Sequence, residues 1–182
     1  MGRCSFGQIP DPLKRSIDMK FSQKIAPCLW FAGEAEEAAR YYTGIFPNSR
    51  IVKIARYGKA GFETHQQTEG TVLTVQFELA GQTFTALNGG PMFKFSEAIS
   101  LQVYVDDQKE LDFYWNKLTA GGDPKSQVCG WLKDKFGLSW QVVPRKFVEW
   151  FGEPSAGTER LMTALMKMGK LDLAMLEKAY RG

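Results

Sequence analysis

The sequence is poor in the side chains that most often carry catalysis or bind metals. Its 182 residues include one histidine, His65, and three cysteines, Cys4, Cys28 and Cys129, with no CxxC pair. Catalytic triads, HExxH zinc sites and two-histidine iron sites all require a histidine in a defined partnership. The lone histidine lies in a polar stretch between two expected strands, and its role stays open. The odd number of cysteines argues against a disulfide framework and favours a reducing, cytoplasmic location.

Long apolar segments and a one-sided charge are also missing. No apolar run approaches the roughly 18 residues of a transmembrane helix, so we expect no membrane partner. The 23 basic and 20 acidic residues nearly balance, and the basic ones are scattered, so we expect no nucleic-acid partner. Residues 1–22 contain Arg3, Lys14 and Arg15 but no apolar core of signal-peptide type. We interpret them as a leader or cloning-derived segment.

The sequence does contain short apolar segments in a repeated order. Residues 26–32 form an apolar run of strand length, and the acidic residues after Gly33 predict the start of a helix. Three strands are expected to follow, at 51–57, 71–79 and 83–88, and the second of them alternates cleanly between apolar and polar residues.

The same order then begins again. An alternating strand is expected at 99–105, a helix after Asp106 and Asp107, and strands at 127–132 and 138–143. The two expected helices align residue by residue, with the pairs Ala38 and Leu111, Tyr41 and Tyr114, Tyr42 and Trp115, and Ile45 and Leu118. Two such stripes could be ordinary core faces, but the matching flanks favour a tandem repeat.

The repeat predicts an α+β fold of tandem βαβββ modules. The modules span about 23–92 and 96–146, and together they make one domain, 23–146. After Pro144 the apolar pattern becomes helical, so residues 147–182 are expected to form a C-terminal helical tail.

Several short segments resemble the PhnB-like branch of the vicinal-oxygen-chelate superfamily, which includes glyoxalase, bleomycin-resistance and dioxygenase proteins. The segments are 25–31, 35–38, 41–42, 45–49, 86–91, 93–95 and 134–141. The resemblance implies that the modules form a curved mixed sheet with a cleft between them, and that the protein is a homodimer. The branch is often labelled 3-demethylubiquinone-9 3-methyltransferase. However, the turn at 31–34 has a single glycine, unlike the glycine-rich turn of doubly wound nucleotide sites, so we expect no methyl transfer.

Metal-dependent members of this superfamily hold a divalent ion between the modules. The resemblance of 134–141 places one equivalent position at Gln141. The repeat then adds the others, because the helix alignment pairs Gln102 with Leu29 and the match of Gly81 with Gly137 pairs Gln141 with Thr85. Leucine cannot ligate a metal, and neutral amides do not balance the charge of a divalent ion. We therefore expect neither a metal nor another cofactor.

The same positions predict a neutral polar cleft for a small organic molecule. The candidate ligand-binding residues are Leu29, Phe31, Thr74, Gln76, Thr85, Ser100, Gln102, Tyr104 and Gln141. The polar strand faces could also simply be exposed to solvent.

Three functions stay open at this point. The first is metal-free binding of a small molecule. The second is an enzyme on an unknown small substrate, with Tyr104, His65 or Glu78 transferring a proton. The third is an interaction module whose tail docks on another subunit. Fold resemblance alone identifies neither the ligand nor a reaction.

Overall fold

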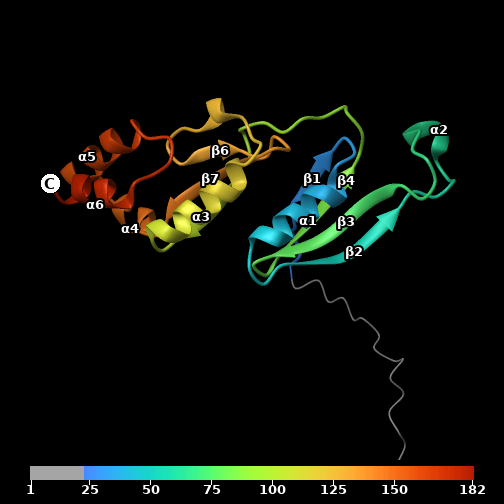
Figure 1. The fold of residues 1–182 in the computed structure, drawn as a ribbon, viewed down its shortest axis with the longest axis horizontal. Helices are drawn as coiled ribbons and strands as arrows, with labels where there is room; N and C mark the ends of the chain where they lie inside the picture. Colours follow the sequence, from blue (N-terminus) through green and yellow to red (C-terminus); the bar gives the residue numbers. More distant parts are fainter. Residues whose placement is uncertain (1–22) are drawn as a thin grey trace, which may run out of the picture.

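The computed structural model describes residues 23–182, so the predicted leader 1–22 lies outside the described residues. The first unit runs through β1 (Cys28–Phe31), α1 (Ala35–Ile45), β2 (Arg50–Arg56), α2 (Phe62–His65), β3 (Val72–Leu79) and β4 (Gln82–Asn88). Its four strands have the order β1-β4-β3-β2, with β1 parallel to β4 and the other pairs antiparallel. Helix α1 packs on one face of this mixed sheet (Figure 1).

The second unit repeats this plan in shorter form. It contains β5 (Leu101–Val105), α3 (Gln108–Thr119), the 3-10 turn η1 (Pro124–Ser126), β6 (Trp131–Lys133) and β7 (Ser139–Pro144). The strand order is β5-β7-β6, and β5 pairs with β7 in parallel, as β1 does with β4. The α+β class is confirmed, and the strands form two mixed sheets.

The second unit has two strands after its helix, β6 and β7, where a βαβββ module has three. In addition, β6 begins at Trp131, although the sequence predicts a strand from residue 127. Val128 forms only an isolated bridge to Trp131. The next residues, Cys129 and Gly130, have φ angles of 52° and 84°, which turn the chain. Their N–H groups donate to the carbonyl oxygens of Met168 and Gly169 at 2.7 and 2.9 Å. These donors are bonded to the C-terminal tail, so they do not extend a strand ladder.

The predicted helices form where their apolar stripes and caps place them. The buried residues of α3 are Leu111, Tyr114, Trp115 and Leu118. The Asp107 carboxylate accepts from the Glu110 N–H at 2.8 Å, and the Glu110 carboxylate accepts from the Asp106 N–H at 2.8 Å. This reciprocal arrangement satisfies two N–H groups at the start of the helix.

The tail contains α4 (Phe147–Trp150), α5 (Ala156–Leu165) and α6 (Leu173–Arg181). Ser155 caps α5 and Asp172 caps α6, each accepting an N–H from the first turn. The Gln108 amide connects α3 to this region, because it donates to the Leu171 carbonyl at 3.1 Å and accepts from the Leu173 N–H at 2.9 Å. Figure 1 places the tail at one end of the molecule and α2 at the other.

The two units meet around a buried polar group. Asp134, only 2% exposed, precedes the turn between β6 and β7. Its Oδ2 accepts from the Tyr42 hydroxyl on α1 at 2.7 Å and from Trp140 Nε1 on β7 at 2.8 Å. Phe46 stacks on both Tyr114 and Trp140 beside it, with ring centroids 5.1 and 5.5 Å apart. The described part of the chain has no helix long and apolar enough to cross a membrane.

Candidate functional site

Four of the predicted ligand-binding residues form one hydrogen-bonded chain on the second sheet. The Tyr104 hydroxyl donates to Gln102 Oε1 at 2.7 Å, Gln102 Nε2 donates to Gln141 Oε1 at 3.2 Å, and Gln141 Nε2 donates to Ser100 Oγ at 2.7 Å. The parallel register of β5 and β7 explains this arrangement, because it sets Gln102 directly beside Gln141. Tyr104 lies two residues further along β5 and therefore on the same face.

The chain leaves hydrogen-bonding capacity for a ligand. A glutamine amide has two N–H donors and a carbonyl oxygen with two lone pairs. In this chain Gln102 and Gln141 each use one donor and one lone pair. Each amide therefore keeps one donor and one acceptor for another molecule.

This face is covered by the C-terminal tail, and a pocket of about 380 Å³ lies between them. The sheet contributes Gln102, Tyr104, Trp131, Gln141 and Val143, and Cys129 precedes β6. The tail contributes Phe147, Val148, Phe151, Met162 and Leu165. None of these side chains is an acid, a lysine, an arginine or a histidine. The pocket therefore combines an amide and hydroxyl floor with an apolar wall.

The tail wall is the part of this pocket that the sequence does not predict. Its aromatic and methionine residues read as ordinary packing of amphipathic helices. The short spacing of Phe147 and Phe151 indicates a helical apolar face, but no feature of the sequence shows which sheet that face covers.

Three predicted residues belong to the other sheet. Gln76 lies opposite Thr85, and Thr74 lies opposite Leu87, in the β3–β4 pairing. Thr74, Gln76 and Thr85 are half-buried and share one face, as their alternation predicts. This face belongs to a sheet that shares no strand pairing with β5-β7-β6, and none of the three lines the pocket under the tail.

Leu29 and Phe31 lie on the core side of β1, away from the face of Thr85, and Phe31 also lines a pocket between the two units. They are 6% and 4% exposed and belong to the hydrophobic core. The residues of β1 on the side of Thr85 are Cys28, directly beside it, and Trp30, beside Leu87. The expected equivalence of Leu29 and Gln102 is therefore off by one residue, and a shift of one residue turns each side chain of a strand to the opposite face.

The donor set on the second sheet does not fit a divalent cation. Gln102 and Gln141 offer neutral amides, and Thr85 lies on the other sheet. Divalent metals in this kind of site are held by imidazole, thiolate or carboxylate groups. Within residues 23–182, no three side chains of histidine, cysteine, aspartate or glutamate lie together as a possible metal site.

His65 serves the loop between β2 and β3. Its Nδ1 accepts from the Gln67 N–H at 3.0 Å, so Nε2 carries the hydrogen and faces the Ala60 carbonyl oxygen at 3.1 Å. The ring also packs on Tyr57, with the centroids 4.6 Å apart. Both ring nitrogens are engaged within the loop, at the far end of the molecule from the tail (Figure 1).

The arrangement of strands and helices is that of the glyoxalase and bleomycin-resistance fold. Residues 23–143 match the family described as 3-demethylubiquinone-9 3-methyltransferase, and the chain belongs to this family. It is similar to a putative 3-demethylubiquinone-9 3-methyltransferase, PhnB protein, from Bacillus cereus. The two share 39% identity over 67% of this chain and 99% of that one, with a TM-score of 0.57.

Two more distant structures share the fold. Protein PA1353 from Pseudomonas aeruginosa is 20% identical over 68% of this chain and 98% of its own, with a TM-score of 0.52. The fosfomycin resistance protein FosX from Mesorhizobium loti is 15% identical over 72% of this chain and 98% of its own, with a TM-score of 0.51. No curated protein matches the sequence. Helices α4 to α6 follow the segment that the family matches.

Proposed function

We propose that this protein binds a small, uncharged organic molecule, without a metal, in the pocket between the second sheet and the tail. The observation that carries the proposal is the chain from Tyr104 through Gln102 and Gln141 to Ser100 beneath an apolar wall. Small-molecule sites typically combine such a wall with a few fixed polar groups.

The lining also defines the chemistry of the ligand. The free donor and acceptor of each amide suit a carbonyl, amide or hydroxyl group, which can form a pair of hydrogen bonds with one glutamine. The rest of the molecule would lie against Phe147, Phe151 and Met162. A charged group would lose its hydration without gaining an opposite charge, so neutral compounds fit this pocket better.

Binding is a better proposal than catalysis because the candidate proton-transfer groups lie apart. Glu78 is on the first sheet, where hydrogen bonds from Arg50, the shorter at 2.8 Å, lower the pKa of its carboxyl group. His65 lies in the β2–β3 loop, and Tyr104 alone of the three lines the pocket. A methyltransferase of the common doubly wound type has a parallel sheet with a glycine-rich turn, whereas both sheets here are mixed.

Thermal unfolding in the presence of a library of neutral metabolites tests the proposal. A compound at 100 times its dissociation constant stabilises a protein by about 2.7 kcal/mol. We expect such a compound to stabilise the wild type but not Gln102→Leu or Gln141→Leu. Gln76→Leu is the matched control, because it makes the same change on the other sheet. Stabilisation that survives in both pocket variants, or a library without any stabilising compound, would contradict the proposal.

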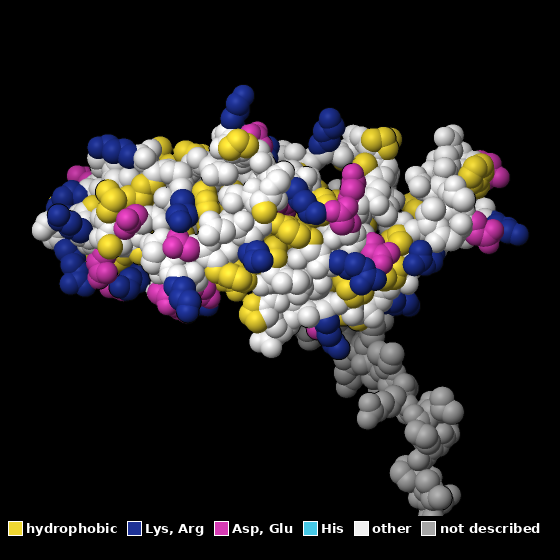
Figure 2. All heavy atoms as spheres, in the orientation of Figure 1, with side chains coloured by type: hydrophobic (Ala, Val, Ile, Leu, Met, Phe, Trp, Pro, Cys, Tyr) yellow, Lys and Arg dark blue, Asp and Glu magenta, His cyan; other side chains and the backbone are white. Residues whose placement is uncertain are grey.

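We also propose that the protein is a cytoplasmic homodimer. Among the described residues, Cys28 and Cys129 form no disulfide with each other, which supports a reducing location. Figure 2 shows apolar side chains at the surface of the tail, and Val148 and Met166 near the pocket are exposed. Exposed apolar groups of this kind are typical of protein interfaces. Light scattering of the full chain checks the assembly, and a monomer at micromolar concentration would refute it.

A further inference from the structure

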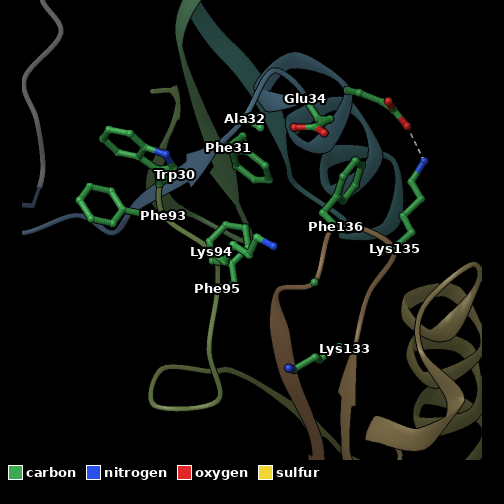
Figure 3. A pocket seen from close by; sticks show the side chains of 12 residues that line it. Trp30, Phe31, Ala32, Glu34, Phe93, Lys94, Phe95, Lys133, Lys135 and Phe136 are labelled. Carbon is green, nitrogen blue, oxygen red and sulfur yellow. Dashed lines mark hydrogen bonds and ion pairs between the residues drawn. The ribbon is translucent and has the colours of Figure 1, made fainter. Parts of the chain in front are cut away.

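A second pocket, of about 490 Å³, lies between the two units (Figure 3). Three segments that are far apart in the sequence form it. They are β1 with the residues that follow it, the segment after β4, and the turn between β6 and β7. Their lining residues are Trp30, Phe31, Ala32, Glu34, Glu37, Phe93, Lys94, Phe95, Lys133, Lys135, Phe136 and Gly137. This pocket differs in chemistry from the pocket under the tail, because its lining contains charged side chains.

The aromatic rings are held in place by their neighbours. Phe31 meets both Phe95 and Phe136 edge to face, with ring centroids 5.3 and 6.1 Å apart. Trp30 meets Phe93 in the same way at 5.0 Å, and its Nε1 donates to the Gly90 carbonyl at 2.7 Å. Ring edges and faces in this arrangement form a fixed aromatic surface suited to a planar molecule.

Two of the three lysines that line the pocket are already paired with carboxylates. Lys133 pairs with Glu97 at 2.5 Å, and Lys135 pairs with Glu37 at 2.6 Å. The Lys135 ammonium also lies 4.8 Å from the centroid of the Phe136 ring. The Glu34 carboxylate accepts from the Gly33 N–H at 2.9 Å and lies at the start of α1, where the helix dipole favours a negative charge.

Lys94 is the cation that remains. Within residues 23–182 it belongs to none of the ion pairs. Figure 3 shows its side chain next to Phe95, with its nitrogen on the side of the pocket where Phe136 lies. The pocket therefore offers rings and one lysine ammonium without an ion-pair partner in the described part of the chain. The Glu34 carboxylate also has no ion pair within the described residues, but the Gly33 N–H and the start of α1 already stabilise its charge.

We propose that this pocket binds a planar aromatic compound with one negative charge, such as an arylcarboxylate. The aromatic part lies among Phe93, Phe95 and Phe136, and the carboxylate pairs with the Lys94 ammonium. The site is separate from the pocket under the tail and selects the opposite kind of ligand, because its polar contribution is a charge.

Isothermal titration calorimetry with two probes tests this site. The probes are 2-naphthoate and its uncharged analogue 2-naphthylmethanol. We expect naphthoate to bind more tightly, and Lys94→Gln to weaken naphthoate binding by about three- to fivefold, as for an exposed ion pair. The same substitution should leave 2-naphthylmethanol unchanged, and Lys94→Arg should restore naphthoate binding. Lys59→Gln, at an exposed lysine in the β2–β3 loop, is the matched control.

Phe93→Ala tests the aromatic part of the site without disturbing the core, because Phe93 is 58% exposed. It should weaken both probes. Gln141→Leu should change neither, which separates this site from the proposed function. The proposal would be overturned if the wild type bound the two probes equally well or bound neither at millimolar concentration. It would also be overturned if Lys94→Gln left naphthoate binding unchanged, or if Gln141→Leu abolished binding.

Discussion

Replacing Asp134 should reveal how strongly one buried carboxylate holds the two units together. Its Oδ1 accepts from the N–H groups of Phe136 and Leu138 at 2.9 and 3.1 Å. Its Oδ2 accepts from the Tyr42 hydroxyl and Trp140 Nε1 at 2.7 and 2.8 Å. Asp134→Ala removes the acceptor of all four donors, and the Tyr42 and Trp140 side chains are buried.

The magnitude follows from the cost of buried donors without partners, which is about 1–3 kcal/mol each. Water can enter the space left by the carboxylate and satisfy part of the four donors. We therefore expect Asp134→Ala to lower the free energy of unfolding by about 3–5 kcal/mol, a large fraction of the roughly 5–15 kcal/mol typical of a domain. Asp134→Asn retains one oxygen but points an N–H group at the donors on the other side, so we expect a loss of about 1–3 kcal/mol.

Urea unfolding, followed by tryptophan fluorescence, measures these differences. Asp112→Asn is the matched control, because Asp112 is partly exposed and pairs with Lys170 at 2.7 Å. Such an ion pair contributes less than about 1 kcal/mol. A loss below about 1 kcal/mol in Asp134→Ala would refute the view that this carboxylate organises the contact between the units.

The pH dependence provides an independent check of the same residue. Burial raises the pKa of Asp134, although the hydrogen bonds from Tyr42, Trp140 and two N–H groups lower it in part. The folded protein therefore binds this proton more tightly than the unfolded chain. The resulting stability is present below the unfolded pKa and is lost as the pH rises through the folded pKa. The free energy of unfolding of the wild type, minus that of Asp134→Asn, should therefore decrease as the pH rises through the folded pKa. An increase of this difference with rising pH would contradict the assignment.

Two further substitutions test local features of the fold. Gly89→Ala should destabilise the protein by about 1–3 kcal/mol, because a Cβ would lie 2.2 Å from Cζ2 of Trp30. Thermal unfolding measures the loss, and an unchanged melting temperature would show that the Trp30 ring moves away freely. Asp107→Ala should cost about 1 kcal/mol, because it removes the side-chain acceptor at the start of α3. Asp107→Asn should retain most of this stability in urea unfolding, and equal losses in the two variants would exclude capping as the cause.

Local sequence patterns determined most of the strands and helices and part of the candidate site. The alternation at 99–105 places Ser100, Gln102 and Tyr104 on one face, and the structure joins them to Gln141 in one hydrogen-bonded chain. The helix stripes and acidic starts predict α1 and α3 because side-chain spacing and the first-turn N–H groups are local properties.

Tertiary structure decided the features that depend on distant segments. Strand β1 is apolar in sequence, so no alternation showed that Leu29 faces the core. The N–H groups of Cys129 and Gly130 bond to the tail, which ends the expected strand there. The tail also covers the amide face of the second sheet. A helical apolar stripe shows that a face will be buried, but the partner is set by shape and hydrogen bonding in the folded chain.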